Sequence, residues 1–168
     1  MIGAPHWRSM RSEDLPGIHH LATALFPDHP EDVARFAERL ALGGDLCLTL
    51  ADAESNIGGY AIAYPWPLGR IPALNRPLDG LRGSGDAIYL HDLGVHPDFC
   101  GAGHARAGLA LLVARARMAG AGTIALVAVN ASAEFWWRRG FMHTDVELAL
   151  AVKLASYGAG ARYMVMPV

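Results

Sequence analysis

The chain has 168 residues, the usual size of one domain, so we expect a single domain over residues 1–168. Apolar residues make up 52% of the sequence and charged residues only 18%, a composition that excludes an intrinsically disordered chain. The formal net charge is −2 at pH 7, so no overall positive field attracts phosphate backbones, and we expect no nucleic-acid partner.

The first part of the sequence predicts a strand and two helices. Polar and apolar residues alternate over residues 6–11, as in a strand with one buried face. Ser12 offers an N-cap hydroxyl for a helix that runs towards Phe26. Pro30 marks the start of a second helix, which Gly43 and Gly44 end. The apolar face of this second helix is predicted to consist of Val33, Phe36, Ala37 and Leu40.

A β-hairpin and a long loop follow these helices. Leu46–Ala51 and Ile57–Tyr64 are apolar, strand-forming runs joined by a polar turn. Residues 65–85 contain four prolines and four glycines, so we expect an irregular loop, and long loops in compact domains are often functional. Tyr60, Tyr64 and Trp66 are either core aromatics or part of the wall of a cleft.

The centre of the chain predicts a strand, a glycine-rich turn and a helix. Ala87–Val95 forms the strand, and Gly101 to Gly103 lead into a helix from about His104 to Ala119. Arg106 and Arg117 are expected to be solvated on this helix. Its apolar face is predicted to consist of Leu109, Leu112, Val113 and Ala116.

The C-terminal part completes a mixed pattern of helices and strands. Thr123–Val129 is almost continuously apolar, as in a strand covered on both faces. Ser132 begins a short helix that ends near Gly140, residues 146–157 fit either a helix or a strand, and Tyr163–Val168 predicts a terminal strand. These elements predict an α/β fold, with one mixed sheet flanked by helices.

The sequence gives no sign of a membrane segment or of export. Its longest stretch without Asp, Glu, Lys or Arg runs from Met118 to Ala133, which is shorter than the roughly 20 apolar residues that span a bilayer. The N-terminus lacks the apolar core of a secretory signal. Two cysteines, Cys47 and Cys100, cannot form a disulfide framework. We therefore expect a cytoplasmic protein without membrane association.

The segment from Tyr89 to Ala105 carries the most specific signal for a ligand. It combines a strand, Pro97, a glycine-rich turn and a helix start, where successive backbone N–H groups and the helix dipole favour a phosphate group. The dinucleotide-binding pattern fails because it needs glycine in place of Arg106, and the Gly-Lys-Ser/Thr ending of nucleoside-triphosphate loops is missing. The alternative is a tight turn that only joins the strand to the helix.

This segment resembles the signature of GNAT-type N-acetyltransferases. That signature is an apolar strand, then V-x-P, then [R/Q]-x-x-G-x-[G/A] at the start of a helix, and Val95, Pro97, Gly103 and Ala105 fit it. A second signature places an asparagine after a strand and a short helix that ends in aromatic-x-x-x-G-F. The sequence has Val129-Asn130 followed by FWWRRGF at residues 135–141. The resemblance extends over most of the chain, because the predicted helices and hairpin upstream of the two motifs also follow the order of elements in that family.

The resemblance implies a GNAT-like acyltransferase fold whose central sheet is splayed between Ala87–Val95 and Thr123–Val129, with acetyl-coenzyme A in the gap. It implies that the pyrophosphate lies on the amides of the glycine turn and that the pantetheine arm pairs with the strand edge. For Asn130, a turn residue or helix cap is an alternative. The implied coenzyme A-binding residues are Leu93, Gly94, Val95, Cys100, Gly101, Ala102, Gly103, His104, Ala105, Asn130 and Trp136.

Two residues depart from the family pattern. Cys100 stands where Arg or Gln is usual, so one side-chain contact to phosphate is missing; as a nucleophile it would lie at the phosphates, away from the thioester. Trp136 stands where the family places the tyrosine that protonates the leaving thiol, and an indole N–H is no acid at neutral pH. The general acid is therefore unassigned, with Tyr157 and Tyr163 as possible donors.

An amine acceptor requires a base, because an alkyl ammonium with a pKa of about 10.4 is protonated at pH 7. His91 is the leading candidate, since imidazole titrates near pH 6.5 and His91 lies on the strand that would line the acetyl pocket. Its alternative role is a packed histidine bound to backbone. Asp92 is the second candidate, provided that a bulge turns it to the same face. The resemblance to the family implies that the backbone N–H of Val95 stabilises the oxyanion of the tetrahedral intermediate.

The sequence thus predicts an enzyme that moves the acetyl group of acetyl-coenzyme A to a primary amine of a small molecule or peptide, by direct attack in a ternary complex. The alternative is a coenzyme A-binding module that has lost catalysis. No metal is expected, because His19 and His20 are consecutive and no metal-ligand spacing occurs. A homodimer is an expectation from the family alone. The first two helices and the loop at residues 65–85 are expected to shape the acceptor pocket.

Overall fold

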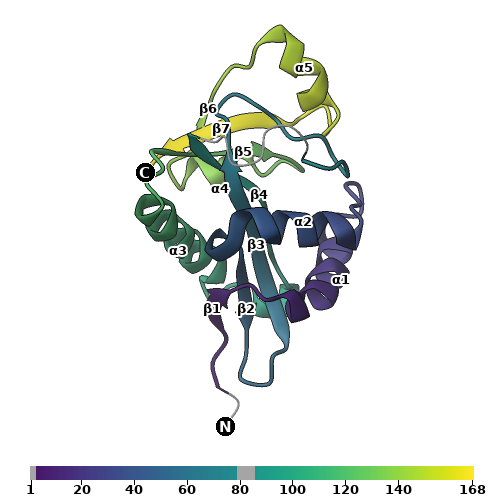
Figure 1. Cartoon of the computed structure of the whole chain (residues 1–168), viewed down its shortest axis with the longest axis vertical. Coiled ribbons are helices and arrows are strands. Elements are labelled where there is room, and N and C mark those ends of the chain that lie inside the picture. The colour runs from purple at the N-terminus through teal and green to yellow at the C-terminus, as the bar shows by residue number, and fades with distance from the viewer. Residues whose placement is uncertain (1–2, 79–85) are drawn as a thin grey trace.

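A computed structural model of the chain describes residues 3–78 and 86–168. Its strands form a seven-stranded sheet in the order β1-β2-β3-β4-β5-β7-β6 (Figure 1). The strands are β1 (His6–Ser9), β2 (Leu48–Ala51), β3 (Ile57–Trp66), β4 (Ala87–Val95), β5 (Thr123–Ala128), β6 (Met142–His143) and β7 (Arg162–Pro167). The helices are α1 (Leu15–Leu25), α2 (Val33–Gly43), α3 (His104–Met118), α4 (Ala133–Trp137) and α5 (Leu148–Ala155), with short 3-10 turns at Ser12–Asp14, Gly44–Leu46 and Pro97–Phe99.

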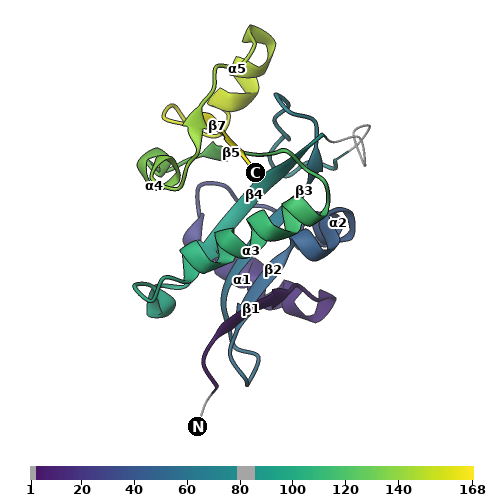
Figure 2. The same ribbon diagram turned by 90° about the vertical axis from the view of Figure 1, so that its left-hand side faces the viewer.

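Helices cover both faces of the sheet. α1 and α2 pack on one face and α3 packs on the other (Figure 2). The alternation of β3 supplies both cores, because Tyr60, Ile62 and Tyr64 face α1 and α2, whereas Ala61 and Ala63 face α3. The predicted mixed α/β fold is therefore confirmed. No helix in the two described ranges is both long and apolar enough to cross a bilayer.

The centre of the sheet is split. β4 and β5 run parallel and pair only through Ile88 with Ile124 and Tyr89 with Ala125. β3 continues beside β4 as far as Val95, and β5 pairs with β7 along its whole length. The predicted splay between the two central strands is confirmed, and it leaves the second half of β4 without a strand neighbour on the β5 side.

β4 contains a bulge at His91. Asp92 pairs with Ile62 and Leu90 pairs with Ala63, so His91 is the extra residue between two successive pairs. A bulge interrupts the alternation of side chains along a strand. Consequently His91 contacts Tyr64 and Asp92 contacts Tyr60, and both tyrosines lie on the face covered by α1 and α2.

The first two helices differ in detail from the sequence prediction. Ser12 lies in a 3-10 turn and caps nothing with its side chain; the carboxylate of Asp14 instead accepts the N–H of Arg11 at 2.8 Å. The second helix begins at Val33 rather than at Pro30. Val33 is exposed, and Arg39 takes a fully buried place on the helix face that was predicted to be apolar.

Four other elements were predicted correctly to within a few residues: the hairpin, the helix after the glycine turn, the β5 strand and the terminal strand. The ambiguous segment at residues 146–157 contains helix α5, and the two-residue strand β6 was not predicted. β3 extends to Trp66, so the predicted loop begins later than Pro65, and its part at residues 79–85 lies outside the described residues.

Candidate active site

A cavity of about 220 Å³ lies where β4 and β5 separate. β4 contributes Leu90, His91, Asp92 and Leu93 to its wall, and β5 contributes Leu126 and Val127. The other lining residues come from the α1–α2 connection, the loop after β3, the segment from β5 into α4, and the end of α5: Phe26, His29, Glu31, Leu74, Val129, Asn130, Ser132, Phe135, Trp136 and Tyr157. The split in the sheet therefore encloses space for a ligand.

Asp92 presents a buried carboxyl group to this cavity. The hydroxyl of the fully buried Tyr60 donates to its Oδ2 at 2.5 Å. Burial raises the pKa of Asp92 to about 7, even though the hydrogen bonds from Tyr60 and from the backbone of Leu93 lower it. A carboxyl group with this pKa can accept a proton near neutral pH and release it again.

His91 is held by protein groups at both ring nitrogens. Its Nε2 lies 2.6 Å from Oε1 of Glu31, and its Nδ1 lies 3.2 Å from the hydroxyl of Tyr64. The carboxylate of Glu31 can only accept a hydrogen bond, so the proton of the ring is on Nε2. The lone pair of Nδ1 then accepts a hydrogen bond from the hydroxyl of Tyr64. Burial and the charge of Arg39 lower the pKa of His91, although Glu31 raises it. The neutral ring thus has no lone pair left for a substrate.

Glu31 links His91 to a buried cation. Its Oε2 lies 2.7 Å from Nη2 of Arg39, whose side chain is 0% exposed. Burial would raise the pKa of Glu31, but His91 and Arg39 together lower it to about 2. Glu31 is therefore ionised, and its charge is matched by a guanidinium that ligands in the cavity cannot reach.

The backbone of Val95 turns towards the split. The N–H of His96 donates to the carbonyl of Gly58, which belongs to the β3 side. Successive N–H groups along an antiparallel strand point to opposite edges, so the N–H of Val95 is directed to the edge that β5 has left. Gly94 is buried and packs against Leu25 and Tyr60, so its contribution to a ligand would come from the backbone alone.

The glycine turn presents free donors at the start of α3. Gly101 and Gly103 have φ angles of 85° and 77°, and a Cβ built at either would meet open space. Residues 100–103 are exposed, and His104 and Ala105 are partly exposed. Among hydrogen bonds between described residues, none uses the backbone N–H groups of residues 101–106 as donors. An anion can therefore be bound there by main-chain groups.

Positive charge lies close to this turn. The thiol of Cys100 is exposed and contacts only the carbonyls of Val95 and His96, at 3.9 and 3.6 Å. A groove between α3, the end of α4 and β7 is lined by four arginines, of which Arg106 stands in the first turn of α3. They are Arg106, Arg117, Arg138 and Arg139.

Asn130 and Trp136 both line the cavity. Asn130 and the next residue have φ angles of 53° and 60°, so Asn130 forms a turn after β5 as well as part of the cavity wall. Trp136 is 9% exposed and packs edge-on against Phe135 and Phe141 at centroid distances of 4.9 and 5.5 Å. The indole thus closes the cavity by packing.

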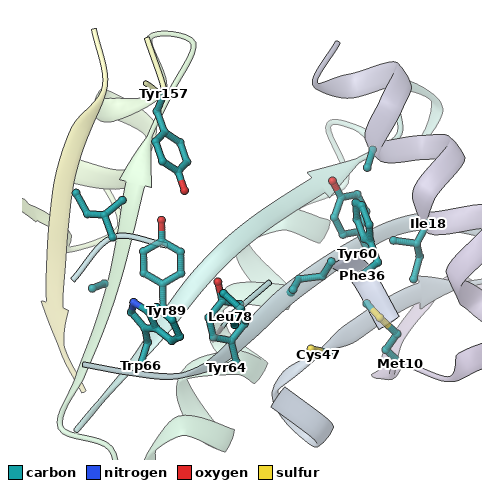
Figure 3. Packing of buried hydrophobic residues seen from close by; sticks show 14 of the residues in the cluster. Met10, Ile18, Phe36, Cys47, Tyr60, Tyr64, Trp66, Leu78, Tyr89 and Tyr157 are labelled. Atoms are coloured by element: carbon teal, nitrogen blue, oxygen red, sulfur yellow. The ribbon is translucent and has the colours of Figure 1, made fainter. Parts of the chain in front are cut away.

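The two tyrosines predicted as proton donors lie in different surroundings. Tyr157 lines the cavity, and its hydroxyl donates to the carbonyl of Pro72. The hydroxyl of Tyr157 also faces the hydroxyl of Tyr89 (Figure 3). The hydroxyl of Tyr163 accepts the N–H of Gly69 at 2.8 Å, and Tyr163 does not line the cavity. Burial raises the pKa of both, so neither is a ready acid at neutral pH.

Sequence reasoning missed the groups that set the chemistry around His91 and Asp92. Tyr60 and Tyr64 are core aromatics, as one of the two predicted alternatives had it, and do not line the cavity, but their hydroxyls bind Asp92 and His91. Arg39 had a usable signal, since it stands three residues after Phe36 on the buried face of α2. Glu31 follows Pro30 in a helix connection and had none.

Comparison with known proteins agrees with this geometry. Residues 7–141 match the model of the family described as Acetyltransferase (GNAT) family. No protein of curated function matches the sequence.

Several solved structures share the fold at low sequence identity. Ard1 from Thermoplasma volcanium is 12% identical, with a TM-score of 0.73 over 98% of both chains. Naa50 from Arabidopsis thaliana, in complex with the bisubstrate analogue CoA-Ac-MVNAL, is 17% identical, with a TM-score of 0.67 over 96% of this chain and 97% of that one. GphF, a GNAT-like decarboxylase in complex with isobutyryl-CoA, is 17% identical, with a TM-score of 0.79 over 96% of this chain and 98% of that one.

Proposed function

From the premise that this chain belongs to the GNAT acetyltransferase family, we propose that it transfers the acetyl group of acetyl-coenzyme A to a primary amine. The observation that carries the proposal is Asp92, a buried carboxyl group with a pKa raised to about 7 that faces the cavity in the split sheet. Perturbed titratable groups in a cavity are typical of proton-transfer sites.

The residues around the split fit coenzyme A by their chemistry. The free N–H groups at residues 101–106 and the groove arginines suit its phosphates. The backbone of Leu93, Gly94 and Val95 suits its pantetheine arm, because that edge of β4 has no strand neighbour. Asn130 and Trp136 complete the cavity wall on the opposite side.

These groups support direct attack in a ternary complex. The ammonium group of the acceptor first loses one proton to water, and the free amine then gives a second proton to the carboxylate of Asp92 as its nitrogen forms a bond to the thioester carbon. The N–H of Val95 stabilises the oxyanion, the carbon–sulfur bond breaks, and the proton passes to the thiolate, giving an amide and a free thiol. Because a thiol has a pKa of about 8.5, its thiolate can leave without a dedicated acid. This agrees with Trp136 at the position where the family has a tyrosine.

His91 serves as a positioning residue in this scheme. Its lone pair is taken by Tyr64 and its N–H by Glu31, so it holds the bulge of β4 and with it the orientation of Asp92. We therefore propose Asp92 as the base in preference to His91, the first candidate from the sequence.

The test measures free thiol release from acetyl-coenzyme A with a panel of primary amines, beside calorimetric binding of coenzyme A. We expect turnover in the wild type and, in Asp92→Asn, a loss of kcat of at least about 100-fold with unchanged coenzyme A affinity. Coenzyme A binding without turnover for any amine would instead favour a binding module that has lost catalysis.

A further inference from the structure

The cavity has an end that the coenzyme A scheme leaves free. Phe26, His29 and Glu31 reach it from the connection between α1 and α2. Leu74 reaches it from the loop after β3, and Tyr157 from the end of α5. We call this set the acceptor end.

The described residues at the acceptor end offer no positive charge to pair with an anionic ligand. Among the described residues that line the cavity there is no Lys or Arg. Arg39 lies behind the wall, is 0% exposed and is already paired with Glu31 at 2.7 Å. A carboxylate brought into this space would lose its water, find no cation among the described lining residues and face the carboxyl group of Asp92.

The remaining wall is apolar. Phe26 and Leu74 pack against the main core cluster, and the ring of Tyr157 is 7% exposed. The hydroxyl of Tyr157 is already bound to the carbonyl of Pro72, so its ring is the part left to a ligand. An alkyl chain or a small aromatic ring suits such a wall, because its burial removes apolar surface from water.

One polar atom at the acceptor end has no partner. The Nε2 of His29 lies 2.8 Å from the carbonyl of Tyr157, and because a carbonyl only accepts, Nε2 carries a proton. In the neutral ring the Nδ1 of His29 is therefore a lone-pair acceptor, and it is buried without a hydrogen bond in the described part of the chain. A buried acceptor in this state is stabilised by a ligand that donates to it.

We propose that the acceptor is a small hydrophobic primary amine without a carboxylate next to its amino group, and that an N–H of this amine binds Nδ1 of His29. This inference rests on the proposed acetyl transfer. It defines an arylalkylamine or alkylamine class and excludes free α-amino acids, in which the carboxylate would enter the acceptor end with the amine.

The test compares phenethylamine with L-phenylalanine, which share a skeleton and differ by the carboxylate. Calorimetry on the protein saturated with coenzyme A should give a dissociation constant at least about tenfold lower for phenethylamine. Equal affinity or tighter binding of phenylalanine overturns the inference. Turnover is read separately: if phenethylamine binds as expected and no thiol is released with any amine, the acetyl transfer fails and the class of ligand stands.

Variants make the test independent of one ligand pair. Leu74→Arg places a cation at the acceptor end and should reverse the preference in favour of phenylalanine, whereas Leu68→Arg adds the same charge at an exposed residue outside the cavity and should leave it unchanged. His29→Ala should weaken phenethylamine at least about fivefold without changing coenzyme A affinity. An unaltered phenethylamine affinity in His29→Ala removes His29 from the proposal.

Discussion

The hydroxyl of Tyr60 on β3 donates to Oδ2 of Asp92 on β4 at 2.5 Å, and Tyr60 itself is 0% exposed. The bulge at His91 brings the two side chains to the same face of the sheet. A hydrogen bond to the ionised form of a carboxyl group lowers its pKa, while burial raises it. Tyr60 therefore keeps a carboxyl group whose pKa is raised by burial within reach of ionisation at neutral pH.

This pairing predicts the pH dependence of Tyr60→Phe. If Asp92 is the base, as proposed, it acts only when ionised, so kcat/KM of the wild type, expressed per concentration of unprotonated amine, should rise with pH through about 7 and then level. Loss of a hydrogen bond to a charged group costs about 1.5–3 kcal/mol, so the rise should move up by roughly one to two pH units in Tyr60→Phe. The measurement is a pH series of thiol release.

The matched control is Tyr64→Phe, which removes a buried hydroxyl from His91 instead of from Asp92. Its pH profile should keep the midpoint of the wild type. A Tyr60→Phe profile that also keeps this midpoint would show that Asp92 is not the titrating group.

The element order could be predicted because its signals are local. The periodicity of α3 and the continuous apolar run of β5 each come from a single window of sequence. The splay between β4 and β5 was predicted only from the resemblance to the family, which Val95, Pro97 and Gly103 carry. β6 has only two residues and therefore left no pattern to detect.

The surroundings of the two base candidates could not be predicted, because they depend on contacts between distant segments. His91 loses its free lone pair to Tyr64, 27 residues earlier, and its N–H to Glu31, 60 residues earlier. Asp92 acquires its pKa from burial under α1 and α2 and from Tyr60. A single strand sequence contains none of these distances.

His91→Gln separates a positioning role from a catalytic one. The glutamine amide can still donate to Glu31, so we expect kcat to stay within about fivefold of the wild type, with an unchanged pH midpoint. His91→Ala removes that donor and should lower both kcat and the melting temperature. If His91 were the base, His91→Gln would lose at least about 100-fold in kcat, as removal of a general base does.

Gly103→Ala tests the phosphate site against a control with the same backbone strain. Gly103 and Gly120 flank α3 with φ angles of 77° and 79°, and a Cβ at either meets open space. Both alanine variants should lose about 1 kcal/mol of stability, because each places a side chain in a left-handed conformation.

Only Gly103 adjoins the free N–H groups of residues 101–106. Calorimetry should therefore show a coenzyme A dissociation constant raised at least about tenfold in Gly103→Ala and unchanged in Gly120→Ala. Equal coenzyme A affinities in the two variants would mean that the turn only connects β4 to α3.

Arg39→Met tests whether the buried ion pair holds the wall of the cavity. The substitution leaves the carboxylate of Glu31 buried without its cation, a change that costs about 3–5 kcal/mol in comparable pairs. Urea unfolding should show this loss at pH 7. The double variant Glu31→Gln with Arg39→Met removes both charges and keeps an amide oxygen for the N–H of His91, so it should recover at least about half of the stability. If the double variant is as unstable as Arg39→Met, the loss comes from the packing of the long arginine side chain, and Glu31 is not held in place by charge.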